Sequence, residues 1–210
     1  MTTLARNPIL DGKPPCPLLV FLSGPSGVGK DTLLMRMREL GFPFHFVVTA
    51  TSRPIRPGER DRFDYHFVST QRFEEMIAHD ELLEWSEVYG HYKGVPKSEV
   101  RQAIASGRDA IFRIDVQGVK KFKRLTPEAV FIFIAPFNFD ELRTRLQLRR
   151  TDSPDEIERR LSLAQQEMEQ VELFDYVVIN HEDRLDEAVG QIRAIIVAEK
   201  QRVLSKQILL

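Results

Sequence analysis

The chain has 210 residues, of which 42% are hydrophobic and 29% are charged. This is the composition of a globular protein, and it excludes disordered, collagen-like and coiled-coil chains. Thirty Lys and Arg residues against 31 Asp and Glu residues leave a formal net charge of -1, so no overall basic field favours nucleic acid. The single cysteine, Cys16, cannot form an internal disulfide, which is compatible with a reducing compartment.

No targeting or membrane segment stands out. Residues 1–17 contain four prolines among charged residues, without the apolar run of a signal peptide. The longest apolar run, residues 129–135, is far shorter than the roughly 20 residues that cross a bilayer. We therefore expect a cytoplasmic monomer or homodimer with no nucleic-acid and no membrane partner. Residues 1–17 are expected to form a flexible leader without a function of their own.

Short apolar runs alternate with helix-like patterns along the rest of the chain. In the first half of the chain we expect a strand at 18–22, a helix at 32–40, a strand at 44–48, a helix at 73–78, a strand at 82–88 and a helix at 98–105. In the second half we expect strands at 110–114 and 130–135, helices at 139–150 and 154–171, a strand at 176–179 and a helix at 185–203. Strands separated by helices pair in parallel through right-handed crossovers. The sequence thus predicts an α/β fold with a central parallel sheet, in one domain over residues 18–210.

Two local features refine this prediction. Ser153-Pro154-Asp155-Glu156 begins a helix, since Ser153 can cap, Pro154 suits the first helical position and Glu156 can complete a capping box. The alternation breaks down between about residues 44 and 96, where residues 53–64 are rich in Pro, Gly and charge. This segment is expected to form a lobe inserted into the domain.

A glycine-rich turn follows the first strand directly and opens the first helix. It reads Gly24-Pro25-Ser26-Gly27-Val28-Gly29-Lys30, the pattern and context of a phosphate-binding P-loop. Glycines let successive backbone N–H groups converge on phosphate oxygens, and the helix N-terminus adds its positive end. The loop predicts a nucleoside triphosphate site in which Lys30 reaches the terminal phosphates.

One position departs from the usual P-loop. The Ser or Thr that normally follows the lysine and holds Mg²⁺ is Asp31, while Thr32 offers a hydroxyl one residue too late. A carboxylate is a hard oxygen ligand and can bind Mg²⁺ directly or through water. Asp31 could equally serve only the helix N-terminus, where a negative charge contributes about 0.3–1 kcal/mol. Both interpretations stay open on the sequence.

Further motifs extend the pattern well beyond the P-loop. They are Thr51-Ser52-Arg53-Pro54-Ile55-Arg56-Pro57-Gly58-Glu59, Asp64-Tyr65-His66-Phe67-Val68, Leu83-Glu84-Trp85, Ile114-Asp115-Val116-Gln117-Gly118 and Arg149 through Arg160-Leu161. Together with the P-loop, these motifs resemble the guanylate kinase family over about residues 18–200. The resemblance implies transfer of the γ-phosphoryl group of ATP to GMP or dGMP with Mg²⁺. It also implies a three-part fold of core, acceptor-binding lobe and lid, the lid lying at about residues 145–155.

The basic residues at motif positions fit this chemistry. Two phosphate-bearing substrates repel each other, so a cluster of always-charged guanidinium groups is expected around them. By resemblance, Arg53, Arg56 and Tyr65 grip the acceptor phosphate. Residues of the donor side and the lid that match family positions are Arg145, Arg149, Arg160 and, as an adenine-side contact, Asn180. Lys30, Arg53, Arg149 and Arg160 are the residues expected to act in catalysis.

Selection of the base rests on fewer matches. Guanine presents an N1–H and an amino group, and Glu84 and Asp115 stand at family positions that can accept from them, with Thr49 keeping a hydroxyl. Three residues depart: Lys93 replaces a tyrosine that touches the acceptor phosphate, Val95 replaces a Ser or Thr at the base edge, and Arg113 replaces an aspartate near the reaction centre.

These departures keep two alternatives open. Asp31 and Val95 also resemble ribose 1,5-bisphosphate phosphokinases, which form PRPP, and added cations at Lys93 and Arg113 would suit such an acceptor. Glu84 and Asp115 would then face a bisphosphate, which is electrostatically unfavourable, so we prefer the guanine interpretation. The second alternative is a non-catalytic binding module, against which the intact loop with Lys30 argues.

The remaining conspicuous side chains are expected to be structural. Trp85, Phe131 and Phe133 are predicted to lie in the core. Residues 120–124, Lys-Lys-Phe-Lys-Arg, are interpreted as a solvated basic helix face. The five histidines show no metal-ligand spacing.

Overall fold

The computed structural model describes residues 17–88, 90–148 and 153–202. A five-stranded sheet forms its centre, and all pairings in this sheet are parallel. In spatial order its strands are β2 (His45–Phe46), β7 (Ala110–Arg113), β1 (Leu19–Ser23), β8 (Val130–Pro136) and β9 (Tyr176–Asn180). The predicted α/β fold with a central parallel sheet is confirmed.

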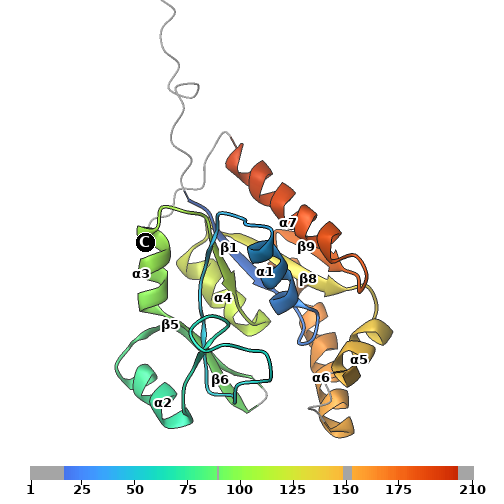
Figure 1. Ribbon diagram of the computed structural model, residues 1–210. Coiled ribbons are helices and arrows are strands. Elements are labelled where there is room, and N and C mark those ends of the chain that lie inside the picture. The colour runs from blue at the N-terminus through green and yellow to red at the C-terminus, as the bar shows by residue number, and fades with distance from the viewer. Residues whose placement is uncertain (1–16, 89, 149–152, 203–210) are drawn as a thin grey trace, which may run out of the picture.

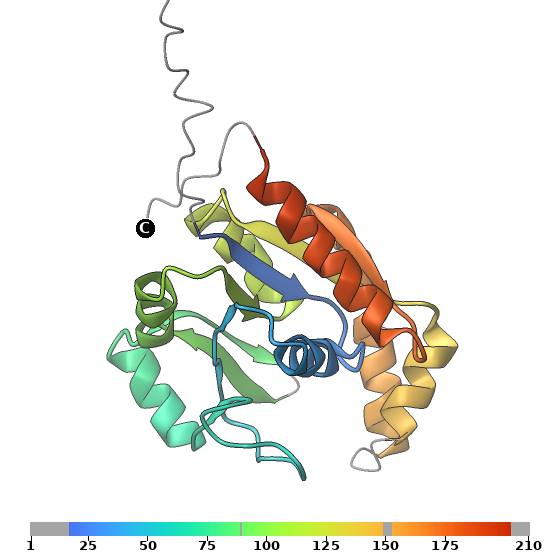
Figure 2. The same cartoon turned by 45° about the horizontal axis from the view of Figure 1, so that its top comes forward.

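Helices cover both faces of this sheet. On one face lie α1 (Lys30–Glu39) and α7 (Leu185–Lys200), which are side by side in Figures 1 and 2. On the other lie α3 (Lys97–Ala105) and α4 (Val116–Leu125). Because successive side chains of a strand point to opposite faces, Val20 packs with the first pair of helices and Phe21 with the second. Burial on both faces explains why the central strands are continuous apolar runs.

A second sheet lies beside the core and forms the second lobe, defined here as residues 50–96 without 89. Its strands are, in spatial order, β4 (His66–Phe67), β3 (Ala50–Thr51), β6 (His91–Pro96) and β5 (Leu82–Val88). Helix α2 (Thr70–Ala78) packs on it through Phe73 and Met76. The sequence placed the start of this insertion near residue 44, but β2 pairs with β7 in the central sheet, so the second sheet begins only at Ala50.

Two helices stand on the other side of the core from the second lobe (Figure 1). They are α5 (Phe139–Leu148) and α6 (Pro154–Met168), and a short 3-10 turn (Val171–Leu173) follows α6. The predicted cap of α6 is confirmed, since the Ser153 hydroxyl accepts the backbone N–H of Glu156 at 3.3 Å. Residues 149–152 of the expected lid lie outside the described residues, as do the expected leader through residue 16 and the end of the last predicted helix.

Of the three aromatic residues predicted to lie in the core, two are buried and one is not. Phe131 and Phe133 are fully buried, as predicted. The prediction for Trp85 is wrong: its side chain is 41% exposed, because it lies on the edge strand β5 with its ring against Tyr92. Among the described residues, no helix is both long and apolar enough to span a membrane.

Candidate functional site

A cavity of about 650 Å³ opens at the carboxyl ends of the central strands, between the core, the second lobe and the start of α6. Side chains and backbone from all three parts line it, although they are far apart in the sequence. The predicted site residues that line it are Ser26, Gly27, Gly29, Lys30, Asp31, Thr49, Arg53, Arg56, Tyr65, Glu84, Lys93, Val95, Asp115 and Arg160. Arg149, predicted as catalytic, lies outside the described residues.

Gly24, Pro25 and Val28 complete the loop, and Arg145 and Asn180 contact it, without lining the cavity. Gly29 has a φ of 96°, and a Cβ there would lie 2.5 Å from the Asn180 side-chain nitrogen. Asn180 donates to the Val28 carbonyl at 2.8 Å, and Arg145 donates to the same carbonyl at 3.0 Å. Thr32 is exposed on α1. Asn180 and Arg145 thus hold the phosphate loop in shape, and their direct contacts to ATP stay a prediction.

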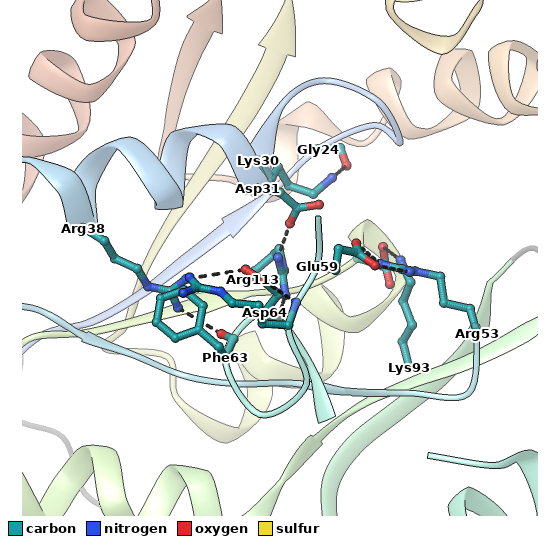
Figure 3. A network of polar contacts seen from close by, with 12 residues as sticks. Gly24, Lys30, Asp31, Arg38, Arg53, Glu59, Phe63, Asp64, Lys93 and Arg113 are labelled. Atoms are coloured by element: carbon teal, nitrogen blue, oxygen red, sulfur yellow. Dashed lines mark hydrogen bonds and ion pairs between the residues drawn. The ribbon is translucent and has the colours of Figure 1, made fainter. Parts of the chain in front are cut away.

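Lys30 is folded back onto the loop that precedes it (Figure 3). Its ammonium donates to the carbonyls of Gly24 and, at 3.0 Å, of Pro25. Burial lowers the pKa of Lys30, while the negative charge of Asp115 opposes this shift. The loop therefore carries its cation at the cavity wall and shields it from bulk solvent.

Asp31 makes an ion pair that the sequence did not foresee. Its carboxylate accepts a hydrogen bond from Arg113 at the end of β7 (Figure 3). Burial alone would raise the pKa of Asp31, but the charges of Arg113 and Lys30 lower it to about 2. The carboxylate is therefore ionised, and it does more than favour the helix N-terminus.

In the second lobe, a carboxylate organises the loop that carries two of the predicted arginines. Glu59 accepts from both terminal nitrogens of Arg53, at 2.7 and 2.5 Å, and from the backbone N–H of Arg56 at 2.8 Å. The Arg53 guanidinium also lies over the Tyr65 ring, 4.9 Å from its centroid. Glu59 was in the quoted motif but had no predicted role; it closes the loop so that both arginines line the cavity.

Glu84 places a buried carboxylate in the lining of the cavity. The residue is 6% exposed, and burial raises its pKa to about 7, with the charge of Asp115 adding to the shift and that of Lys121 opposing it. Gly118 makes room for it, since a Cβ at that position would lie 3.1 Å from the carboxylate. No hydrogen bond to this carboxylate is formed within the described part of the chain, so it is available to a ligand.

Lys93 and Asp115 form a pair beside Glu84. The Lys93 ammonium donates to Asp115 at 3.1 Å. Burial disfavours the charged ammonium, but the Asp115 carboxylate outweighs it and the pKa of Lys93 is raised. Two carboxylates and one ammonium therefore face this end of the cavity, together with the buried residues Thr49 and Val95.

Helix α6 contacts the phosphate loop through two charged residues on one face. Arg160 donates to the Ser26 hydroxyl at 3.4 Å and to Glu156 at 3.1 Å. Glu167, buried and not predicted, lies near Ser26 and Lys30; burial raises its pKa to about 7, against the opposing charge of Lys30. The spacing of seven residues places Arg160 and Glu167 on the same helix face, and this was the signal that could have found Glu167.

Comparison with known proteins agrees with this geometry. A family model described as guanylate kinase matches residues 17–199. The chain is 44% identical to guanylate kinase 2, chloroplastic/mitochondrial, of Oryza sativa subsp. japonica over 96% of this chain and 70% of that protein. It is 44% identical to a guanylate kinase of Desulfitobacterium hafniense over 90% of this chain and 94% of that protein. The crystal structure of guanylate kinase from Anaplasma phagocytophilum superposes with a TM-score of 0.71 at 30% identity, covering 89% of this chain and 88% of that one.

Proposed function

Because the chain belongs to the guanylate kinase family, we propose that it transfers the γ-phosphoryl group of ATP to GMP or dGMP. An oxygen of the acceptor phosphate forms the new bond to the γ-phosphorus of ATP. The bond between the γ-phosphorus and the oxygen that bridges to the β-phosphate breaks, so that ADP and GDP, or dGDP, are released. The observation that carries the proposal is that the phosphate loop with Lys30 shares one cavity with the carboxylates of Glu84 and Asp115.

Phosphoryl transfer asks little covalent chemistry of a protein, because alignment and charge neutralisation supply most of the rate. The phosphate loop and Lys30 would hold the donor phosphates. Arg53 and Arg56, held by Glu59, and Tyr65 would hold the acceptor phosphate. Arg160 lies against the loop at Ser26, where it would neutralise charge on the donor side.

The base would bind at the other end of the cavity. Guanine offers an N1–H and an amino group, and Glu84 and Asp115 are acceptors with Thr49 beside them. A ribose bisphosphate has no such donors, and its phosphates would face two carboxylates at short range, which is electrostatically unfavourable. Neither the ribose bisphosphate kinase nor the non-catalytic module is favoured by the comparisons, whose named relatives are guanylate kinases.

The donor set fits a magnesium ion carried with ATP. Among the described residues no cluster of three or more metal-binding side chains occurs. Mg²⁺ commonly takes only one or two protein carboxylates and completes its shell with phosphates and water. Asp31, ionised and at the cavity wall, would be the protein ligand. When bound, the ion would neutralise charge on the triphosphate.

The proposal is tested by an acceptor panel. ADP release from Mg·ATP is followed with GMP, dGMP, AMP and ribose 1,5-bisphosphate as acceptors. Release with GMP or dGMP, and little with AMP, is the expected result. Release only with ribose 1,5-bisphosphate would replace the proposed acceptor, and no release with any acceptor would support the non-catalytic module.

A substitution at Gly118 should weaken GMP binding although no charged residue is replaced. The Cβ of Gly118→Ala would lie 3.1 Å from the Glu84 carboxylate, closer than ordinary packing allows. We expect displacement of Glu84 and a rise of about fivefold in the GMP dissociation constant, equivalent to about 1 kcal/mol. Isothermal titration calorimetry measures it.

Gly190→Ala is the matched control for Gly118→Ala. Gly190 lies within α7, where a new Cβ meets nothing within 4 Å. This variant should keep GMP affinity and gain stability, because alanine favours a helix over glycine. Equal GMP affinity in both variants would contradict the placement of the base. The cytoplasmic location and the monomeric or homodimeric state stay predictions from the sequence.

A further inference from the structure

Arg113 is the residue at which the donor and acceptor sides of the cavity touch each other. It ends β7 and is 9% exposed. One terminal nitrogen donates to the Asp31 carboxylate, and the other donates to the backbone carbonyl of Asp64 at 2.5 Å. Its guanidinium also lies over the Tyr65 ring, 3.8 Å from the centroid. A single side chain thus contacts three residues at once, as Figure 3 shows for Asp31 and Asp64.

These partners belong to different parts of the fold. Asp31 is in the first turn of α1, next to Lys30 on the donor side. Tyr65 directly precedes β4 of the second lobe, and its ring also contacts the guanidinium of Arg53. The contacts therefore run without a gap from Asp31 through Arg113, Tyr65 and Arg53 to Glu59. This series begins at the phosphate loop and ends in the acceptor loop.

The ion pair also relates two departures from the family pattern. Asp31 stands where a hydroxyl was expected, and Arg113 stands where a carboxylate was expected. In the structure the two are partners, so a carboxylate on α1 and a guanidinium at the end of β7 neutralise each other. Arg113 is the buried member of the pair, so removing the Asp31 carboxylate would leave the guanidinium charge buried without its anionic partner, which is destabilising.

We propose that Arg113 is a positioning residue that couples the two substrate sites, so that ATP and GMP favour each other's binding. The inference rests on the proposed function. GMP bound in the second lobe orders the segment at Tyr65 and thereby Arg113 and Asp31, so the donor site has less ordering to complete. The guanidinium lines the cavity, where its positive charge would reduce the repulsion between the two anionic substrates.

The experiment measures this coupling directly. The GMP dissociation constant is determined by calorimetry without, and then with, a saturating non-hydrolysable ATP analogue and Mg²⁺. The ratio of the two constants is the coupling factor. It is compared in the wild-type protein, Arg113→Ala, Arg113→Lys and Asp31→Asn, and thermal unfolding by circular dichroism checks that each variant is folded. Lysine keeps the positive charge but lacks the two terminal nitrogens with which Arg113 donates to both the Asp31 carboxylate and the Asp64 carbonyl.

Arg38 supplies the matched control. It lies on α1, donates to the Phe63 carbonyl at 3.4 Å and lies 3.9 Å from the Asp64 carboxylate, so it anchors the same segment of the second lobe to the core (Figure 3). The structure shows no hydrogen bond from Arg38 to Asp31. Arg38→Ala therefore loosens the segment without breaking the link to the phosphate loop.

We expect Arg113→Ala to lower the coupling factor about tenfold, Arg113→Lys and Asp31→Asn to lower it partly, and Arg38→Ala to leave it within about twofold of wild type. The double variant Asp31→Asn/Arg113→Ala should lose no more coupling than Arg113→Ala, because both act through one ion pair. An unchanged factor in a folded Arg113→Ala or Arg113→Lys variant would overturn the inference. An equal loss in Arg38→Ala would also overturn it, since anchoring alone would then suffice. Failure of the wild-type protein to bind GMP would instead refute the proposed function.

Discussion

Lys30→Ala should lower turnover with GMP and ATP by about 100- to 1000-fold, the loss expected when one charge that stabilises the transition state is removed. Lys30 lies at the phosphate loop, where burial strengthens its interaction with anionic oxygens. Because it serves the transferring group and not the base, GMP affinity should change by less than about threefold. A coupled assay for ADP and calorimetry with GMP measure the two quantities.

The control for Lys30→Ala is another lysine on a helix. Lys120 is exposed on α4, so Lys120→Ala should leave turnover and GMP affinity unchanged. If Lys30→Ala retained normal turnover, Lys30 would have no role in the transfer. A loss of GMP affinity as large as the loss of turnover would show that the loop shapes the acceptor site as well.

Glu84→Gln should raise the GMP dissociation constant by about 10- to 100-fold, because a buried acceptor for the guanine N–H groups is replaced by an amide that also presents donors. ATP affinity should not change.

The pKa of Glu84 is raised to about 7 by burial, so the carboxylate of the free protein is largely protonated below that pH. GMP binding by the wild-type protein should therefore weaken as the pH falls below about 7. The variant should lack this dependence.

Stability supplies an independent check on the same group. A carboxyl whose folded pKa lies above its ordinary value of 4.5 destabilises the fold increasingly as pH rises from that value to about 7. Glutamine carries no charge, so Glu84→Gln should be more stable than wild type above pH 7 and should have no such advantage below about pH 4. Urea unfolding at both pH values measures it. Lower stability of the variant at high pH would contradict the raised pKa of Glu84, and unchanged GMP affinity would contradict the placement of guanine at Glu84.

Local patterns predicted most of the framework. The apolar runs that became β1, β7, β8 and β9 are long enough to be recognised, and each is followed or preceded by helix-like periodicity. The phosphate loop was also predictable, since the glycine spacing, the lysine and the flanking elements are contiguous in the chain. Strands β3, β4 and β6 were missed. Two residues carry no usable periodicity in β3 and β4, and β6 contains Gly94 and Pro96, which are not typical of a strand.

Local sequence patterns could not predict which side chains contact each other in the folded protein. Glu167 was missed because its role depends on α6 returning to the phosphate loop; its seven-residue spacing from Arg160 places both on one helix face but does not show what that face contacts. Trp85 was misplaced because composition cannot tell an edge strand from a central one. Glu59 was visible in a motif, yet only the closed loop shows that it holds Arg53 and Arg56.

By itself the sequence determined the fold class, the phosphate loop and the family to which the chain belongs, because each depends on residues that are neighbours in the chain or on spacing along it. Only the tertiary structure decided that Asp31 and Arg113, 82 positions apart, neutralise each other at the boundary between the core and the second lobe. Burial set the pKa of Glu84 in the same way. The energy of a charge depends on its distance from other charges and from water, and both distances exist only after the chain has folded.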